Sequence, residues 1–274
     1  MSNLKIEYFG IKTRIINSSE NLVKILIEYL NNDESTNEKS LALQSGDIIV
    51  IASKIVAMEQ NRIVDLKTIN PSKLSFELAN KANLPPEFVE IVINESDEII
   101  GAVKGALLTL RHGDVQANAG VDKSNVINGK AILLPLNPNQ YAEEFKSAIE
   151  KELKIKNIGV LVVDSSTRPL RIGTVGLALG SAGFPAIVDI RGQPDLFGNK
   201  MKITLRNIAD NLACGANILM GESSESIPFV IIRGLQELTT KYNWNNNKVD
   251  DLKIDPKQCL YFGNMEYKSI KTFK

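Results

Sequence analysis

The sequence is poor in the residues that build disulfide scaffolds and zinc sites. Among its 274 residues are two cysteines, Cys214 and Cys259, and a single histidine, His112. Two cysteines are too few for a disulfide scaffold or a four-thiolate zinc site, so a reducing cytoplasm is the simplest expected location, with a single bridge left open. No His-Glu-x-x-His motif is present, which argues against a zinc hydrolase, and His112 is better explained as a structural residue than as a general base.

The sequence also lacks an excess of charge of either sign and a long apolar run. Lys plus Arg and Asp plus Glu each number 32, so no basic field exists to hold a nucleic acid or an anionic membrane. The first residues have neither the basic head nor the apolar run of a secretory signal. Residues 172–188 are uncharged but broken by glycines and a proline, which indicates a buried glycine-rich segment instead of a membrane span. We expect neither nucleic acid nor membrane as a partner.

Two common nucleotide-binding motifs are missing as well. There is no Gly-x-x-x-x-Gly-Lys-Ser/Thr loop, so a nucleotide would not be held by a P-loop. There is no Gly-x-Gly-x-x-Gly either, which weakens a dinucleotide-binding fold. Any anion site must therefore be built locally by other means.

What the sequence does contain is an alternation of apolar runs and helical stretches. This pattern favours a mixed α+β fold, as one large domain or two interleaved lobes. The expected strands are residues 48–51, 99–103, 132–134, 158–163 and 229–232. The expected helices are residues 19–30, 139–154 and 204–220, the last ending at Gly221 as a left-handed cap, so that Glu222 emerges just past a helix end.

Carboxylates with neighbouring hydroxyl or amide groups occur in two places. Residues 158–163 are apolar on both alternating faces, which predicts a buried strand that ends at Asp164, beside Ser165. Asp122 and Asn125 lie three positions apart after Gly120, where one tight turn would let them meet. Metal binding and a plain helix cap or Asx-turn are both open interpretations, and the metal interpretation is slightly favoured for Asp164 and Ser165.

A pair of arginines follows the first of these carboxylate sites. Arg168 and Arg171 lie on either side of Pro169, whose ring stiffens the loop that carries them. Two guanidinium groups on a fixed frame suit the recognition of phosphate or carboxylate, and surface salt bridges are the equally open alternative.

Taken in order, the motifs resemble those of the coenzyme F420-0:L-glutamate ligases, the coenzyme F420 gamma-glutamyl ligase family, from roughly residue 8 to 235. The motifs are Ser-Gly-Asp-Ile-Ile-Val-Ile (45–51), Arg-His-Gly (111–113), Ala-Asn-Ala-Gly-Val-Asp-Lys-Ser-Asn (117–125), Asp-Ser-x-x-Arg-Pro (164–169), Gly-Leu-Ala-Leu-Gly-Ser-Ala-Gly (176–183), Arg-Gly-x-x-Asp-Leu-Phe-Gly (191–198) and Met-Gly-Glu (220–222). The resemblance implies a gamma-glutamyl ligase-type fold with buried strands in an intertwined homodimer. We expect a catalytic unit over residues 1–240, as one body or two interleaved lobes. The tail carries little of the resemblance, but Cys259, Leu260, Tyr261 and Phe262 predict that residues 241–274 form a C-terminal extension that packs on this unit.

The resemblance further implies an activity and its small-molecule partners. Members of this family join L-glutamate in γ-linkage to the deazaflavin precursor of coenzyme F420. They use GTP, two divalent metal ions (magnesium or manganese) and often a monovalent cation such as potassium. The implied first step is attack of the acceptor carboxylate on the γ-phosphate of GTP, with Arg168 or Arg171 offsetting charge, to give an acyl phosphate.

Carried over by motif, the resemblance also assigns ligand-binding residues. Asp122 and Asp164 would ligate one metal ion, and Ser165 and Glu222 the second. The implied nucleotide pocket is formed by Gly10, Ile11, Lys12, Thr13, Ser53, Lys54, Asn125, Met220, Gly221, Glu222, Ser223, Ser224, Glu225, Ser226 and Ile227.

The sequence departs from the family pattern at two places that bear on the substrate. Met58 stands in the segment 57–62, where family members usually have Ala-Glu-Gly-Arg, and Ser166-Thr167 replace the usual Phe-Gly after the metal motif. Two alternatives therefore stay open. One is a paralogous amide ligase that acts on another carboxylate acceptor, and the other is a non-catalytic protein of the same fold that binds GTP and metal.

Overall fold

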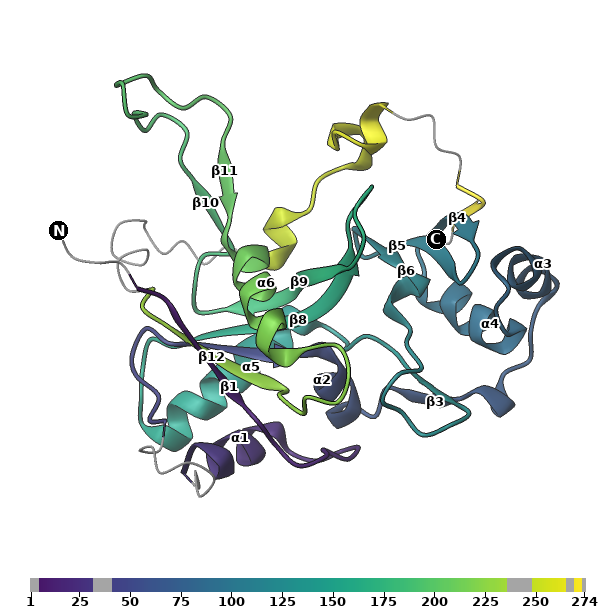
Figure 1. Cartoon of the computed structure of the whole chain (residues 1–274), viewed down its shortest axis with the longest axis horizontal. Helices are drawn as coiled ribbons and strands as arrows, with labels where there is room; N and C mark the ends of the chain where they lie inside the picture. The colour runs from purple at the N-terminus through teal and green to yellow at the C-terminus, as the bar shows by residue number, and fades with distance from the viewer. Residues whose placement is uncertain (1–4, 32–40, 236–247, 265–268, 273–274) are drawn as a thin grey trace. The chain divides into compact units, whose positions relative to one another are not determined.

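The computed structural model describes residues 5–31, 41–235, 248–264 and 269–272, which are drawn in colour in Figure 1. The chain divides into two compact units. The first unit combines residues 1–59, 136–165 and 174–252. The second combines residues 60–135, 166–173 and 253–274. Parts of the predicted C-terminal extension, residues 241–247, 265–268 and 273–274, lie outside the described residues.

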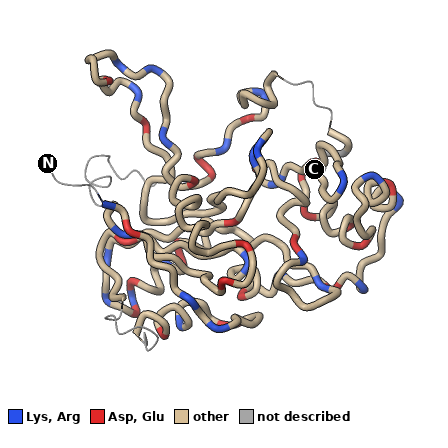
Figure 2. The backbone as a smooth tube through the Cα atoms, viewed as in Figure 1, with Lys and Arg blue, Asp and Glu red and all other residues tan. Residues whose placement is uncertain are grey.

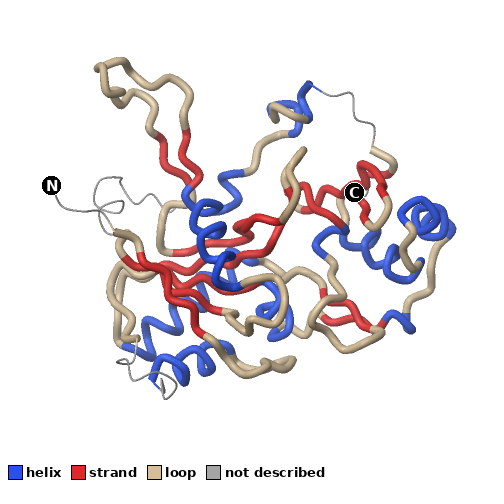
Figure 3. The backbone as a smooth tube through the Cα atoms, in the orientation of Figure 1, coloured by secondary structure: helices blue, strands red, loops and turns tan. Residues whose placement is uncertain are grey.

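The first unit is built on a five-stranded sheet in the order β1-β12-β2-β8-β9. Figure 3 draws the strands of the molecule in red and its helices in blue. The strands are β1 Glu7–Ile11, β12 Phe229–Arg233, β2 Ile48–Ala52, β8 Gly159–Thr167 and β9 Thr174–Ala182. The helices of this unit are α1 Leu22–Asn31, α2 Ser53–Glu59, α5 Pro138–Leu153 and α6 Ile208–Met220. A two-stranded ribbon, β10 Ile187–Asp189 and β11 Leu205–Asn207, and the 3₁₀ turn η3 Val249–Leu252 complete it.

The middle strands of this sheet are apolar on both faces because both faces are covered. Ile48 and Val50 of β2 join the core cluster that contains Leu212 of α6, and Ile49 and Ile51, which project to the other face, are also fully buried. Strand β2 pairs in parallel with β8 and antiparallel with β12, which pairs antiparallel with β1. The predicted mixed α and β structure is confirmed, with the expected strands at 48–51 and 229–232 in the centre.

One prediction about this sheet is wrong. The strand expected to end at Asp164 continues to Thr167. Its parallel pairing with β2 stops where Ala52 meets Val163, and β9 is its neighbour on the other side. Asp164 therefore lies inside β8, at the point where β2 has already ended.

Helices α1 and α6 both start later in the sequence than predicted. Residues 205–207 form β11, and α6 begins at Ile208 because the Asn207 side chain accepts the Asp210 N–H at 2.9 Å. Helix α1 begins at Leu22 after Asn21, whose side chain accepts the Lys24 N–H at 2.9 Å.

The predicted end of α6 at Gly221 is confirmed, although its geometry differs from the expected left-handed cap. The φ of Gly221 is 68°, but its ψ of −171° is extended. The predicted emergence of Glu222 just past the helix end is confirmed.

The second unit contains a four-stranded sheet in the order β13-β4-β5-β6 and a two-stranded sheet of β3 and β7. The strands are β4 Glu98–Val103, β5 Ala106–Arg111, β6 Asp114–Ala117, β13 Lys271–Thr272, β3 Ile63–Asp65 and β7 Lys130–Ile132. Helices α3 Lys73–Ala82 and α4 Pro86–Glu95 supply Leu78, Phe88 and Val92 to its core. Short 3₁₀ turns occur at η1 Leu66–Thr68, η2 Asn118–Gly120, η4 Pro256–Gln258 and η5 Phe262–Asn264.

The segment after residue 247 contributes to the core of the first unit. Val249 is only 2% exposed and joins the cluster around α6, and Asn139 donates a hydrogen bond to Asp250 at 2.7 Å. Leu260 and Tyr261, further along, are exposed.

Charges of both signs alternate along the described backbone (Figure 2). Within the part of the chain that the structure describes, no helix is long and apolar enough to cross a membrane.

Candidate functional site

Segments assigned to the nucleotide meet at one end of the central sheet in the first unit. Strand β12 runs antiparallel to both neighbours, so its start at Phe229 lies beside the ends of β1 and β2, opposite Ile11 and Ile51. The Thr13 N–H donates to the Ser226 carbonyl at 2.8 Å, and the Ala52 N–H donates to the Pro228 carbonyl at 3.0 Å. The structure thus brings residues 10–13, which end β1 and directly follow it, the start of α2 at Ser53 and Lys54, and the end of the loop 220–227 to one place.

Strand β1 approaches the loop 220–227 closely at Gly10, where the lack of a side chain makes room. A Cβ built on Gly10 would lie 2.9 Å from Cγ2 of Ile227, tighter than ordinary van der Waals contact. Two predicted nucleotide segments that are more than two hundred positions apart in sequence therefore pack directly against each other.

The same end of the sheet carries the first candidate metal ligand, Asp164. The Ser53 hydroxyl, 4% exposed at the start of α2, donates to Oδ1 of Asp164 at 3.1 Å. Ala52 of β2 pairs in parallel with Val163 of β8. Ser53 and Asp164 are the next residues of the two segments, so they also lie side by side. Ser165 is the next residue of the same strand, so its side chain projects to the opposite face from Asp164.

Glu222 is held by two residues that the sequence did not indicate. Its Oε1 accepts a hydrogen bond from Thr174 Oγ1 at 2.8 Å and another from Asn217 Nδ2 at 3.1 Å. Asn217 lies in the last turn of α6, five residues before Glu222, a spacing that could have suggested the contact. Thr174 begins β9 and is far away in sequence, so no local signal could have identified it.

In the loop that follows Glu222, the Glu225 carboxylate folds back against the residues before it. Glu225 accepts the Ser223 N–H at 2.8 Å, and a Cβ built on Gly221 would lie 2.2 Å from the Glu225 carboxyl carbon. Gly221 and Ser226 both have positive φ, at 68° and 56°. These contacts give the predicted nucleotide loop a fixed backbone shape.

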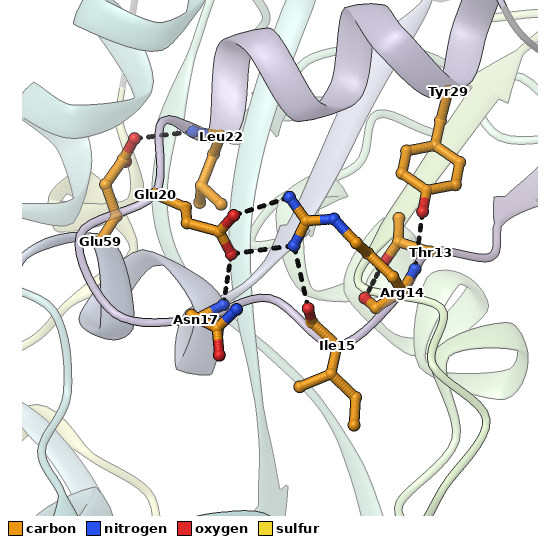
Figure 4. Close-up of polar contacts among 8 residues, drawn as sticks. All are labelled: Thr13, Arg14, Ile15, Asn17, Glu20, Leu22, Tyr29 and Glu59. Carbon is orange, nitrogen blue, oxygen red and sulfur yellow. Dashed lines mark hydrogen bonds and ion pairs between the residues drawn. The ribbon is translucent and has the colours of Figure 1, made fainter.

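The chain leaving Thr13 is fastened by a network of polar contacts (Figure 4). The Arg14 guanidinium donates two hydrogen bonds to Glu20, at 2.9 and 2.6 Å, and the Arg14 N–H donates to the Tyr29 hydroxyl at 2.8 Å. The hydrogen bonds from the Arg14 guanidinium lower the pKa of Glu20 from 4.5 to about 2. The Asn17 N–H, which donates to the same carboxylate, adds to the shift. The segment that follows Thr13 is therefore held by Tyr29 and by the Glu20 carboxylate.

Glu59, which neighbours Met58, anchors the far end of the same loop. One of its carboxylate oxygens accepts the N–H of Leu22, the first residue of α1, at 2.8 Å, as Figure 4 shows. The other accepts the Tyr141 hydroxyl at 2.5 Å. Burial, followed by the charge of Glu59, raises the pKa of Tyr141 well above its usual value. The segment that departs from the family pattern thus has a structural role inside the first unit.

Asp122 and Asn125 belong to the second unit. Both Asp122 backbone groups pair with Ile132, and Oδ1 accepts the N–H groups of Lys123 and Ser124 at 2.6 and 2.9 Å. The Ser124 hydroxyl donates to the other carboxylate oxygen. Asn125 has a positive φ of 53°. The Asx-turn that the sequence left open is therefore formed by the Asp122 side chain.

Arg168 and Arg171 are grouped with the second unit and are exposed. The Arg171 N–H donates to the Arg168 carbonyl at 3.2 Å, which closes a turn across Pro169 and the fully exposed Leu170. The predicted metal ligands thus divide between the units, with Asp164, Ser165 and Glu222 in the first and Asp122 in the second.

The donor chemistry of these residues suits a hard divalent cation. Carboxylate, hydroxyl and amide oxygens are the ligands that magnesium takes, usually with one or two carboxylates and substrate phosphates. Among the described residues, no group of three or more His, Cys, Asp or Glu side chains is gathered closely enough to hold a metal ion. The acids could therefore supply some of the ligands of such an ion, with phosphate oxygens of the substrate and water supplying the others.

Comparison with known proteins agrees with the resemblance. The model of the F420-0:Gamma-glutamyl ligase family matches residues 10–234. A coenzyme F420:L-glutamate ligase of Methanocaldococcus jannaschii is 39% identical over 263 residues, 95% of this chain and 98% of that protein. The protein of the same name from Archaeoglobus fulgidus is 36% identical over 79% of this chain and 88% of its own length. The one from Methanosarcina mazei is 35% identical over 85% and 87%. Since the family model covers most of the sequence, the chain belongs to the F420-0:gamma-glutamyl ligase family.

Proposed function

We propose that this protein is a GTP-dependent ligase that adds L-glutamate, through a γ-linkage, to the deazaflavin precursor of coenzyme F420. The observation that carries the proposal is the similarity over 95% of the chain to a protein named coenzyme F420:L-glutamate ligase. The meeting of residues 10–13, the start of α2 and the loop 220–227 supports a nucleotide site in the first unit.

The proposed reaction has two steps. The terminal carboxylate oxygen of the acceptor attacks the γ-phosphorus of GTP, and the bond to the β–γ bridging oxygen breaks, giving GDP and an acyl phosphate. The amine of L-glutamate then attacks the acyl carbon, loses a proton and expels inorganic phosphate, leaving an amide. The activated carboxyl group makes amide formation favourable at the expense of one phosphoanhydride bond.

The residues at the end of the sheet would bind and orient the nucleotide. The backbone of residues 10–13 and of the loop 220–227, with Ser53 and Lys54, would line the nucleotide pocket, and the family resemblance assigns Asn125 to nucleotide binding as well. Arg168 and Arg171 would offset the negative charge that develops during phosphoryl transfer, because guanidinium groups match phosphate oxygens in pairs.

The same proposal assigns metal ligands. Asp122 and Asp164 would hold one divalent ion, and Ser165 and Glu222 a second, with magnesium or manganese suited to the oxygen donors and potassium as an additional monovalent ion. When bound, such ions neutralise phosphate charge and orient the reacting groups. Ser53 orients Asp164 through its hydroxyl, and Thr174 and Asn217 orient Glu222. We extend the proposal to a cytoplasmic homodimer, as the family resemblance implies.

An isotope experiment tests the proposed chemistry. The acceptor is prepared with ¹⁸O in its terminal carboxylate, and the phosphate released with GTP and L-glutamate is analysed by mass spectrometry. An acyl phosphate route transfers one ¹⁸O atom to each phosphate. Unlabelled phosphate from a reaction that forms product would contradict the route, and a reaction without acceptor gives the background of simple GTP hydrolysis.

The same assay separates the alternatives raised by Met58 and by Ser166-Thr167. Turnover only with a different carboxylic acid would favour a paralogous amide ligase. GTP binding without turnover for any acceptor tested would favour a non-catalytic protein.

A further inference from the structure

We infer that Arg62, held by Glu95, is a positioning residue that fixes the Asp122 turn for cation binding. This inference rests on the proposed function, because it concerns a carboxylate that the proposal assigns to a divalent ion. All the contacts that carry it lie within the second unit.

Asp122 is held by a neighbouring strand as well as by its own turn. Its N–H donates to the Ile132 carbonyl at 3.0 Å, and the Ile132 N–H donates back to the Asp122 carbonyl at 2.8 Å. On its other side Ile132, the last residue of β7, pairs with Ile63 of β3. The position of Asp122 therefore depends on where the end of β7 lies.

Arg62, the residue before β3, grips the chain directly after that point. Its carbonyl accepts the Leu133 N–H at 3.0 Å, and its side-chain Nε donates to the Leu134 carbonyl at 3.2 Å. The Leu134 side chain lies against Gly120, where an added Cβ would be 2.5 Å from Leu134 Cδ1. Arg62 thus fixes residues 133–134, which directly follow the Asp122 partner Ile132, and Leu134 contacts Gly120, two residues before Asp122.

The Arg62 guanidinium is held by a charge cluster of low exposure. Glu95, at the end of α4, accepts from Arg62 at 2.7 Å and from Arg111, at the end of β5, at 3.1 Å, through the same oxygen. The side chains of Arg62, Glu95 and Arg111 are only 19%, 17% and 8% exposed. Burial lowers the pKa of Arg111, although the charge of Glu95 opposes that shift. An ion cluster this far from solvent keeps its geometry better than an exposed pair.

Only an arginine can make both contacts of Arg62 at once. Its planar fork reaches the Leu134 carbonyl through Nε and Glu95 through a terminal nitrogen, whereas a lysine ammonium is a point donor on a flexible stem. Arg62→Lys keeps the charge but cannot bind the Leu134 carbonyl and Glu95 at the same time. Residues that orient metal ligands typically change metal affinity by about 10- to 100-fold when altered.

The test measures manganese binding directly, by the electron paramagnetic resonance signal of free Mn²⁺ with a non-hydrolysable GTP analogue present. The variants are Arg62→Lys, Asp122→Asn and the control Arg233→Lys. Arg233 is a matched control because it is also mostly buried, at 17% exposed, and also bridges a carboxylate, that of Asp47, and a carbonyl, that of Ala42. Melting temperature is recorded for all three.

The inference predicts that Arg62→Lys and Asp122→Asn raise the Kd for Mn²⁺ by about 10-fold or more. Arg233→Lys should lower the melting temperature and leave the Kd unchanged. A merely structural role of Arg62 would lower the melting temperature or the number of sites without altering the Kd, and that result overturns the inference. If Asp122→Asn binds manganese as the wild type does, both the inference and the proposed metal role of Asp122 fail, whereas a wild-type Kd for Arg62→Lys alone overturns only the inference. If Arg62→Lys does not fold, Glu95→Gln, which removes the charge that holds the guanidinium, replaces it with the same two outcomes.

Discussion

A hydrogen bond at 3.1 Å joins the side chains of Ser53 and Asp164, two candidate site residues of the first unit. A hydrogen bond to an ionised carboxylate is worth about 1.5–3 kcal/mol. We therefore expect Ser53→Ala to lower kcat/KM about 10- to 100-fold if the contact operates in the transition state. Ser75→Ala in α3 is the matched control, since Ser75 is equally buried and donates only to the Ser72 carbonyl. Equal activities of the two variants would show that Ser53 does not serve the reaction.

Glu20 gives a pH-dependent prediction at the same scale. Its pKa falls from 4.5 to about 2 in the folded protein, so its pairing with Arg14 adds stability above pH 4.5 that is lost as the pH falls through about 2. The pair is exposed, so the effect is small and weakened by salt. Urea midpoints should be lower for Glu20→Gln than for the wild type at pH 7, and this difference should shrink between pH 4.5 and 2. The exposed Glu152→Gln serves as control, and a difference that does not vary with pH would contradict the prediction.

Individual residues differ in how far the sequence could predict them. Glu222 was correctly placed after a helix end because the apolar spacing of α6 and Gly221 are local signals. The strand end at Asp164 was wrong because the extent of β8 depends on β9, which is not visible from the residues around Asp164. The contacts of Thr174 with Glu222 and of Tyr29 with Arg14 also join separate segments, so no local pattern contains them.

Among the elements, α6 packs on β9 at a distance that only glycine permits. A Cβ built on Gly176 would lie 2.3 Å from both the backbone carbon and the oxygen of Ala213. Gly176→Ala must therefore push the helix away, at a cost of about 1–3 kcal/mol or more. Gly101→Ala in β4 is the control, because an added Cβ there meets nothing within 4 Å. Urea unfolding of the two variants checks the prediction, which fails if both are equally stable.

The elements themselves were predictable where one periodicity holds throughout. Residues 48–51 and 229–232 are uniformly apolar and form the buried strands β2 and β12. Leu205 has helical spacing to Ile208 and Leu212, which placed residues 204–207 in the predicted helix, but pairing with β10 makes 205–207 a strand. Short segments of this kind are fixed by their partner and not by their own propensity.

For the whole molecule, residues 248–252 provide a test of how the end of the chain stabilises the first unit. Val249 is 2% exposed in the core around α6. Val249→Ala removes two buried methyl groups and should cost about 2 kcal/mol. A chain ending at residue 247 should be destabilised further, because it also loses the contact of Asp250 with Asn139. Val103→Ala, at a position 68% exposed, is the control, and equal urea midpoints for it and Val249→Ala would contradict this role.

For the whole molecule, the alternation of apolar runs and helical stretches predicted a mixed α and β architecture, and the motifs identified the family. The division into two units that each draw on three stretches of chain was not predictable from periodicity. It depends on contacts between segments as distant as Asp47 and Arg233, which form a buried ion pair at 2.7 Å. Local patterns report the elements but not which of them share a core.

Ligation of glutamate to the deazaflavin precursor with GTP is the activity that we propose for this chain. The most direct test is mass spectrometry of a reaction that contains the protein, GTP, manganese, L-glutamate and the precursor. Asp164→Ala is run beside it, together with Asp65→Asn as a control aspartate that only caps the turn after β3. We expect a product one glutamate heavier and an equal amount of GDP from the wild type and Asp65→Asn, and no product from Asp164→Ala. Absence of that product from the wild type, or undiminished product from Asp164→Ala, would contradict the proposal.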